Sequence, residues 1–373
     1  MQQPGLYLHV PFCRSKCPYC DFYSLANTSL IPDWLEALVS EMALYKGRFG
    51  TFDSLYMGGG TPSFLPDFGL ETLMHQVQDH FVFAPETEIS IEANPKDLTP
   101  ERVSRLKSLG FNRISVGVQS FDNGELSFLG RQHNARDAMD AVSRVRDAGF
   151  ANVGMDLIYG LPGQDMAGWF HTLETALSFT PEHLSCYQLT IENGTVFSRM
   201  KKKGNLTPIG EDLEEAFFLR TSAFLADRGY LHYEISNFAR GREHVCRHNR
   251  KYWDHTPYLG LGPSAHSFED GWRWWNVRSI REYCGALKSG NRPVEGEEAL
   301  SRAQMHLESV ALGLRTREGF AHAEIHDPTA RKRLEELEAA GFLLREGTRV
   351  VPTMKGFLVA EHLPLYLCGD GQP

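Results

Sequence analysis

The chain has 373 residues, of which 42% are hydrophobic and 23% are charged, a composition typical of a globular protein with a sizeable core. Its formal net charge of -9 argues against nucleic acid as the main partner, because phosphate binding relies on an excess of Lys and Arg. The sequence shows neither an export signal nor a run of about 18 apolar residues that would cross a membrane. Together with an odd number of cysteines, seven, these features predict a cytoplasmic protein with free thiols.

Short apolar runs alternate with amphipathic segments up to residue 230, which is the pattern of repeated β-α units around a parallel sheet. The predicted strands are 6–10, 52–57, 87–93, 113–118, 152–158 and 183–189. The predicted helices are 32–45, 66–80, 100–109, 135–148 and 166–179. Six strands are too few for a complete eight-stranded barrel. The sequence therefore predicts an α/β fold with a partial (β/α)6 barrel over residues 1–230, in which ligands sit at the loops after the strands.

Residues 299–373 have a different pattern. Helices are predicted over 302–315 and 331–340, followed by two apolar strands around Gly347 and a final helix from Lys355. This order predicts a C-terminal helical, winged-helix-like domain. Given the acidic net charge, its expected role is interaction or a lid, not DNA reading. Residues 231–298 are predicted to connect this domain to the barrel.

Three cysteines, Cys13, Cys17 and Cys20, follow the first predicted strand with the spacing C-x3-C-x2-C. Two prolines in this stretch favour a loop over a helix, and a loop lets three thiolates converge on one centre. Three close thiolates suit an iron-sulfur cluster with one iron left open, whereas a structural zinc ion takes four protein ligands. Two alternatives stay open at this point: a zinc site completed by His9, and three unrelated buried thiols.

Glycine-rich or polar segments end four of the predicted strands. The second strand is followed by Gly58-Gly59-Gly60-Thr61, and the next three end near Glu92, Gln119 and Asp156. Glycines let the backbone approach a ligand, and their amides bind a carboxylate or phosphate. Each segment alone has a structural explanation, but together on one rim of a barrel they predict a shared ligand site.

A polar and aromatic segment, Cys246 to Trp253, stands out beyond the barrel. The imidazole of His248 suits an axial ligand of haem iron, and Tyr252 and Trp253 offer flat apolar surface for a porphyrin. Cys246 is a second candidate ligand. Basic side chains that suit the haem propionates are Arg247, Arg250 and Lys251. The alternative is a polar loop that the two aromatic residues anchor to the core.

The cysteine spacing, with Tyr19 before the last cysteine, resembles the radical S-adenosylmethionine (SAM) superfamily. Within it, the whole chain resembles the branch that contains the oxygen-independent coproporphyrinogen III oxidases and the HemW-type haem chaperones. The resemblance implies a [4Fe-4S] cluster on Cys13, Cys17 and Cys20, whose open iron is chelated by SAM. The residues that the resemblance places in the SAM region are Tyr7, Tyr19, Gly59, Gly60, Thr61, Glu92, Gln119, Arg131 and Asp156.

The segment from His248 to Trp253 matches the HNxxYW signature that this branch associates with haem binding. By the resemblance, His248 ligates the haem iron, and Asn249, Tyr252 and Trp253 belong to the haem site. The implied function is a haem chaperone that binds haem and delivers it to acceptor haemoproteins. The sequence leaves open whether those acceptors are membrane-bound and whether the chain is a monomer or a dimer.

The alternative function is enzymatic: radical SAM chemistry on a tetrapyrrole, as in the oxygen-independent coproporphyrinogen III oxidase. That oxidase motif carries a further cysteine two positions after the third cluster cysteine, where this chain has Phe22. The oxidase also has a longer arm before its first strand, whereas six residues precede Tyr7 here. Both departures argue against oxidase activity. A radical SAM enzyme acting on another tetrapyrrole is the third hypothesis.

Overall fold

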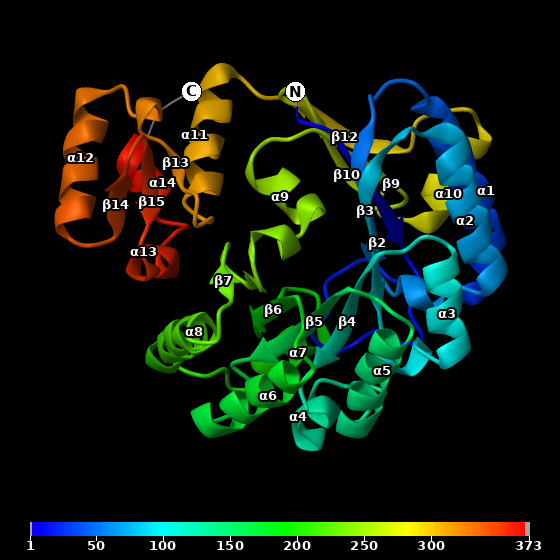
Figure 1. Cartoon of the computed structure of the whole chain (residues 1–373). Coiled ribbons are helices and arrows are strands. Elements are labelled where there is room, and N and C mark those ends of the chain that lie inside the picture. Colours follow the sequence, from blue (N-terminus) through cyan, green and yellow to red (C-terminus); the bar gives the residue numbers. More distant parts are fainter. Residues whose placement is uncertain (1, 370–373) are drawn as a thin grey trace.

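One sheet of 12 strands runs through most of the structure, a computed structural model that describes residues 2–369 (Figure 1). Its central strands are parallel to their neighbours. In spatial order they are β9 (Tyr258–Leu261), β1 (Gly5–Val10), β2 (Phe52–Gly59), β3 (Phe83–Ala93), β4 (Arg113–Gln119), β5 (Asn152–Tyr159) and β6 (His183–Gln188). All six predicted strands form, which confirms the predicted α/β fold with a parallel sheet.

Helices connect the parallel strands and lie around the outside of the curved sheet (Figure 1). They are α1 (Ile31–Leu44), α2 (Asp67–His80), α3 (Pro100–Ser108), α5 (Ala135–Asp147) and α6 (Met166–Ser178). Each begins and ends within one residue of its predicted bounds. Capping residues fix these positions: Thr99 accepts a hydrogen bond from the Arg102 amide at the start of α3, and Asn134 forms a capping box with Asp137 at the start of α5.

The two faces of the parallel strands differ in chemistry. In β1, Leu6, Leu8 and Val10 are fully buried in the core shared with the outer helices. The alternating side chains, Tyr7 and His9, point to the inner face of the sheet. The same alternation gives the inner face of the later strands polar side chains or glycine: Tyr56, Gly58, Ser90, Glu92, Ser115, Gly117, Asp156 and Ser185. The inner face is therefore a polar surface suited to a ligand.

Residues 231–298 add strands to both edges of this sheet. β10 (His266–Glu269), β11 (Trp272–Asn276) and β12 (Val294–Ala299) extend the edge at β9, and β8 (Asn237–Ala239) and β7 (Leu231–His232) extend the edge at β6. β9 could not be predicted from the sequence, because a strand of 4 residues is too short to show a periodic pattern.

Further helices pack around the ends of the sheet. They are α4 (Asn123–Phe128), α7 (Val196–Lys202), α8 (Glu211–Ala226), α9 (Arg247–Trp253) and α10 (Ile280–Lys288). Within residues 2–369, the structure contains no helix that is both long enough and apolar enough to cross a bilayer.

The C-terminal region has a hydrophobic core of its own, which includes Val310, Leu334, Leu343, Val350 and Leu367. Its elements are α11 (Arg302–Gly313), β13 (Phe320–Ala321), α12 (Pro328–Ala339), β14 (Leu343–Glu346), β15 (Arg349–Pro352), α13 (Met354–Leu358) and α14 (Leu363–Cys368). The strands form a separate three-stranded sheet in the order β13, β15, β14. Helices followed by a hairpin are the arrangement that the sequence predicts for a winged-helix-like region.

A buried carboxylate, Glu41, ties α1 to residues more than 200 positions later in the chain. Its side chain is 0% exposed. Glu41 Oε2 accepts hydrogen bonds from the Gly262 amide at 2.8 Å and from the Tyr283 hydroxyl at 2.6 Å, and Oε1 accepts one from Asn276 Nδ2 at 2.6 Å. Burial raises the pKa of Glu41 to about 7. These bonds fix the segment after β9, strand β11 and helix α10 against the barrel.

We expect Glu41→Ala to lower the free energy of unfolding by about 3 kcal/mol or more, because three buried donors lose their acceptor. Urea denaturation followed by circular dichroism measures this change. The matched control is Glu36→Ala, an exposed glutamate on the same helix, which should change the free energy by less than about 0.5 kcal/mol. Equal unfolding midpoints for the two variants would show that the network does not hold these segments together.

Candidate functional site

The three cysteines lie in a loop that leaves β1 and is fastened back onto the chain. The Leu25 amide donates to the Pro11 carbonyl at 2.7 Å, and the Cys13 amide donates to the Leu25 carbonyl at 3.0 Å. The Cys20 amide donates to the Cys17 carbonyl at 3.1 Å, which closes a tight turn between these two ligand positions. All three thiols are free and half-buried. Burial raises the pKa of Cys13 and of Cys20.

The glycine-rich segment after β2 runs beside the cysteine loop. The Gly60 amide donates to the Val10 carbonyl and the Thr61 amide to the Phe12 carbonyl, both at 2.8 Å. A side chain at position 60 would come within 2.7 Å of the Phe12 oxygen, so this approach requires glycine. Thr61 Oγ1 lies 3.2 Å from the Cys13 sulfur. The segment therefore supports one of the three thiols directly.

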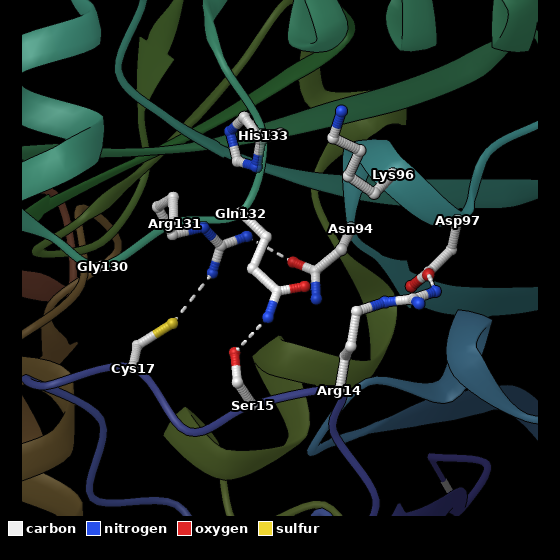
Figure 2. A pocket seen from close by; sticks show the side chains of 10 residues that line it. All are labelled: Arg14, Ser15, Cys17, Asn94, Lys96, Asp97, Gly130, Arg131, Gln132 and His133. Carbon is white, nitrogen blue, oxygen red and sulfur yellow. Dashed lines mark hydrogen bonds and ion pairs between the residues drawn. The ribbon is translucent and has the colours of Figure 1, made fainter.

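Arg131 lies between the cysteine loop and the sheet, as Figure 2 shows. Its Nη1 is 3.5 Å from the Cys17 sulfur and 3.5 Å from the Tyr19 hydroxyl. Its Nη2 donates to the Gly117 carbonyl at 2.9 Å and to Asn94 Oδ1. The residue brings a fixed positive charge to the thiols. Its environment cannot be deduced from its own sequence pattern, which is that of a surface arginine.

Two carboxylates, Glu92 and Asp156, face the same inner surface. Glu92 accepts hydrogen bonds from the Tyr56 hydroxyl at 3.0 Å and from the Gly59 amide at 3.2 Å, and Asp156 accepts one from the Ser115 hydroxyl at 3.0 Å. Burial, with a further contribution from Asp156, raises the pKa of Glu92 to about 7. Burial also raises the pKa of Asp156. Paired carboxylates held in this way suit a cationic group of a ligand.

Gln119, the last residue of β4, completes this group of side chains. It has a positive φ of 68° at a β-bulge in the pairing of β4 with β5. A side chain at Gly117 would lie 3.0 Å from Gln119 Nε2 and 3.4 Å from both Arg131 Nη2 and Asn94 Oδ1. The glycine therefore makes room for three polar side chains from three segments.

The donor set fits an iron-sulfur cluster better than the mononuclear zinc site. Both ring nitrogens of His9 are occupied, Nδ1 by the Tyr7 hydroxyl at 3.2 Å and Nε2 by the Tyr23 carbonyl at 2.9 Å. Three free thiols around one loop match the ligands of a cluster, in which each thiolate binds a different iron.

The HNxxYW residues lie on α9, at the opposite ends of β1 and β2 from the cysteines. His248 is 1% exposed, and its Nδ1 lies 3.2 Å from the Ser54 hydroxyl while its Nε2 lies 2.8 Å from the Tyr252 hydroxyl. Its ring stacks on Tyr7 and Tyr56. Burial lowers the pKa of His248 to about 3, which keeps the imidazole neutral. His248 therefore covers the inner face of the barrel at the end of β1 and β2 that lies opposite the cysteines.

The other residues of the motif are more accessible. Tyr252 is 37% exposed, and Asn249 and Trp253 are half-buried. The Arg315 guanidinium lies 5.6 Å from the centre of the Trp253 ring, so this tryptophan joins α9 to the C-terminal region. The second candidate ligand, Cys246, is buried beside Glu88, and burial raises its pKa to about 12.

Two residues of the site were not predicted from the sequence, Asn94 and Tyr56. Asn94 Nδ2 donates to Thr61 Oγ1 at 3.0 Å, so this amide connects the glycine-rich segment with Arg131. Its position directly after β3 is a signal that strand-end reasoning can detect. Tyr56 gives no such signal, because an aromatic residue inside a strand is usually part of a core.

A pH-dependent stability is expected from Glu92 in the chain without cluster or SAM. The folded-state pKa of about 7 lies above the ordinary value of 4.5, so its stabilising contribution is present below pH 4.5 and is lost as the pH rises through 7. Glu92→Gln stays neutral, so its free energy of unfolding should rise by about 2–3 kcal/mol relative to the original chain between pH 5 and pH 8. Urea denaturation at several pH values measures the difference.

The control for this experiment is Glu86→Gln, an exposed glutamate on the same strand, whose stability difference should not change with pH. If the stability difference between Glu92→Gln and the original chain also stays constant with pH, Glu92 is ionised in the folded chain and the pKa argument is wrong.

Comparison with known proteins places this site in a family. Residues 7–176 match the model of the radical SAM superfamily. The heme chaperone HemW of Mycobacterium tuberculosis (strain CDC 1551 / Oshkosh) is 38% identical over 372 residues, which cover 98% of this chain and 95% of that protein. The heme chaperone HemW of Bacillus subtilis (strain 168) is 32% identical, over 96% of this chain and 97% of that protein.

Among solved structures, coproporphyrinogen III oxidase (HemN) from Escherichia coli superposes with a TM-score of 0.85 over 98% of this chain and 90% of that chain. At 23% identity, this likeness concerns the fold. The similarity to the chaperones extends over nearly the whole length at more than 30% identity, and the chain thus belongs to the HemW family of the radical SAM superfamily.

Proposed function

We propose that Cys13, Cys17 and Cys20 hold the [4Fe-4S] cluster and that SAM binds beside it on the inner face of β2 to β5. Membership of the radical SAM superfamily implies both groups. When bound, the cluster supplies an electron to the sulfonium of SAM. The geometry that supports the SAM position is the convergence of Glu92 and Asp156 with the cysteine loop. The other residues assigned to SAM are Tyr7, Tyr19, Gly59, Gly60, Thr61, Gln119 and Arg131.

The chain functions as a haem chaperone, which binds haem and delivers it to acceptor haemoproteins. The observation that carries this proposal is the similarity along nearly the full chain to proteins named heme chaperones. The HNxxYW residues on α9 supply the aromatic surface and the imidazole that haem binding requires. For haem, the proposal therefore assigns His248, Asn249, Tyr252 and Trp253, with His248 as the iron ligand.

The surroundings of His248 add a condition to this assignment. Its Nε2 is engaged with the Tyr252 hydroxyl at 2.8 Å, and its ring is 1% exposed. Iron ligation by His248 therefore requires the bond to Tyr252 to break and α9 to move away from the barrel. Breaking the bond costs about 1 kcal/mol.

A second function, radical SAM chemistry on a tetrapyrrole, is favoured by one observation. Glu92, Gln119, Arg131 and Asp156 are arranged around the proposed SAM position, although a chaperone needs no SAM cleavage to hold haem. Conversion of coproporphyrinogen III is not part of the proposal, because the position of the additional oxidase cysteine is occupied by Phe22, whose side chain is 68% exposed. Anaerobic assays with SAM and a reductant should therefore yield no protoporphyrinogen IX, and its formation would make the chain an oxidase.

The cluster assignment predicts that Cys13→Ser, Cys17→Ser and Cys20→Ser each lose most of the iron and the visible absorption of the anaerobically purified protein, because thiolates bind the cluster irons. Iron and sulfide per chain measure the loss. The control is Cys284→Ser, which removes a free, half-buried thiol on α10. Full iron content in the three variants would exclude the assignment.

The haem assignment predicts opposite effects for two neighbouring variants. His248→Ala removes the proposed iron ligand and should weaken haem binding by about tenfold or more, a loss of at least 1.4 kcal/mol. Tyr252→Phe keeps the ring but frees His248 Nε2 from its hydrogen bond, and should strengthen binding. Haem titration followed by the Soret band measures both, and transfer of haem to an apo-haemoprotein tests delivery.

His171→Ala, an exposed histidine on α6, serves as the control for the haem titration. If His248→Ala binds haem as tightly as the original chain, His248 is not the ligand. If the original chain fails to bind haem, the chaperone proposal itself is wrong.

A further inference from the structure

Two of the ligand thiols have hydrogen-bond partners of different charge. Cys13 Sγ lies 3.2 Å from the Thr61 hydroxyl, which is neutral. Cys17 Sγ accepts a hydrogen bond from Arg131 Nη1 at 3.5 Å, and this donor belongs to a cation. The surroundings of the two thiols therefore differ by one full positive charge.

A tight turn at the end of α4 places Arg131 beside the cysteine loop. The Arg131 amide donates to the Leu126 carbonyl at 2.9 Å, the bond that closes a Schellman motif. Gly130 takes the left-handed position of this motif, with a φ of 66°. A side chain at position 130 would also come within 2.6 Å of Pro18 Cδ, so the turn packs directly against the loop that carries the thiols.

The donors of the Arg131 guanidinium are almost fully engaged with the protein (Figure 2). Nη2 donates to the Gly117 carbonyl at 2.9 Å and to Asn94 Oδ1. Nη1 donates to Cys17 Sγ and to the Tyr19 hydroxyl, each at 3.5 Å. Because an arginine presents its N–H donors in one rigid plane, the bonds of Nη2 also fix the direction of Nη1. The guanidinium therefore cannot turn away from Cys17 without losing its bonds to Gly117 and Asn94.

Asn94 holds this cation and supports Cys13 as well. Its Oδ1 accepts from Arg131 Nη2, and its Nδ2 donates to Thr61 Oγ1 at 3.0 Å. Thr61 in turn contacts the Cys13 sulfur. One amide thus orients a hydrogen-bonding partner toward each of the two thiols, as residues behind metal ligands commonly do.

A fixed positive charge next to a ligand thiolate affects the two oxidation states of a cluster unequally. Reduction adds one electron, so the reduced cluster is more negative by one charge and is attracted more strongly to a cation. Hydrogen bonds to the ligand sulfurs and the net charge are among the factors that set the reduction potential of such clusters. Arg131 supplies both, because a guanidinium stays protonated in a folded protein.

We propose that Arg131 raises the reduction potential of the cluster through its hydrogen bond to Cys17, with Asn94 as the residue that positions the guanidinium. The inference rests on the proposed cluster and adds to it a role for Arg131 that needs no bound SAM. The change is the transfer of one electron from an external reductant, which is oxidised by one electron, and no covalent bond forms or breaks. The cluster therefore accepts its electron from a weaker reductant than it would without this cation.

The test is a redox titration of the full-length, cluster-loaded chain without SAM. Dithionite is the reductant, and the electron paramagnetic resonance signal of the reduced cluster is the readout. Arg131→Gln removes the charge and should lower the equilibrium constant for reduction by about tenfold, equivalent to a fall of about 59 mV in the potential. Arg131→Lys keeps the charge and should restore part of the potential. Asn94→Ala should lower the constant by about threefold, because the guanidinium loses one of its hydrogen bonds.

Arg14→Gln is the matched control, because it removes an arginine from the same cysteine loop. The Arg14 guanidinium is directed away from the thiols, toward Asp97 at 3.1 Å and the centre of the Phe64 ring at 5.0 Å (Figure 2). The potential of this variant should equal that of the original chain.

Equal potentials in Arg131→Gln and the original chain would overturn the proposal. An equal fall in Arg14→Gln would overturn it too, because the effect would then come from the overall charge of the loop. If Arg131→Gln does not retain the cluster, Asn94→Ala decides, and a potential equal to that of the original chain would reject the role of the hydrogen bond. Absence of iron and sulfide in the original chain would instead reject the cluster proposal.

Discussion

Two backbone hydrogen bonds hold the cysteine loop and the glycine-rich segment together, and the site depends on them. They run from the amides of Gly60 and Thr61 to the carbonyls of Val10 and Phe12. Because both partners are backbone atoms, only the absence of a side chain at Gly60 lets the two segments approach so closely. The loop that carries the thiols is thereby set in register with β2, whose last residue, Gly59, donates its amide to Glu92.

The inner face of the barrel has a charge balance that follows from this arrangement. Glu92 and Asp156 are two buried carboxylates near each other, and a cation close to the thiols, Arg131, is hydrogen-bonded to Asn94 and Gly117. Burying two carboxylates near each other is costly, and their raised pKa values express that cost, although the charges of Arg113 and Arg131 lower the pKa of Asp156. A cationic ligand would relieve it, which gives the site a preference for positive charge before any specific contact is made.

Much of this molecule follows from the sequence, because local signals and global fold agree. The capped helices α3 and α5 and the polar strand positions Glu92 and Asp156 have patterns that a single sequence displays. Arg131 does not, since its partners come from Asn94, Gly117 and Cys17, which are distant in sequence. For such a residue, only the resemblance to a family identifies the role.

Orientation was the other property that the sequence could not provide. The HNxxYW pattern contains an imidazole and aromatic rings but no information on which side of α9 faces the barrel. The structure turns His248 inward, where the hydroxyls of Ser54 and Tyr252 contact its ring nitrogens, and leaves part of the Tyr252 ring exposed. A seven-residue helix with buried and exposed positions of mixed polarity gives no amphipathic pattern from which this could be read.

Helix α11 takes part in two regions at once. Its later turns contribute Val310 to the C-terminal core, while its first turn contributes Arg302 and Met305 to a pocket beside α9. The shape of this pocket and the position of the C-terminal region are consequently linked. A partner that displaces α11 and a ligand that fills the pocket would therefore change each other's affinity by the same factor, because such coupling is reciprocal.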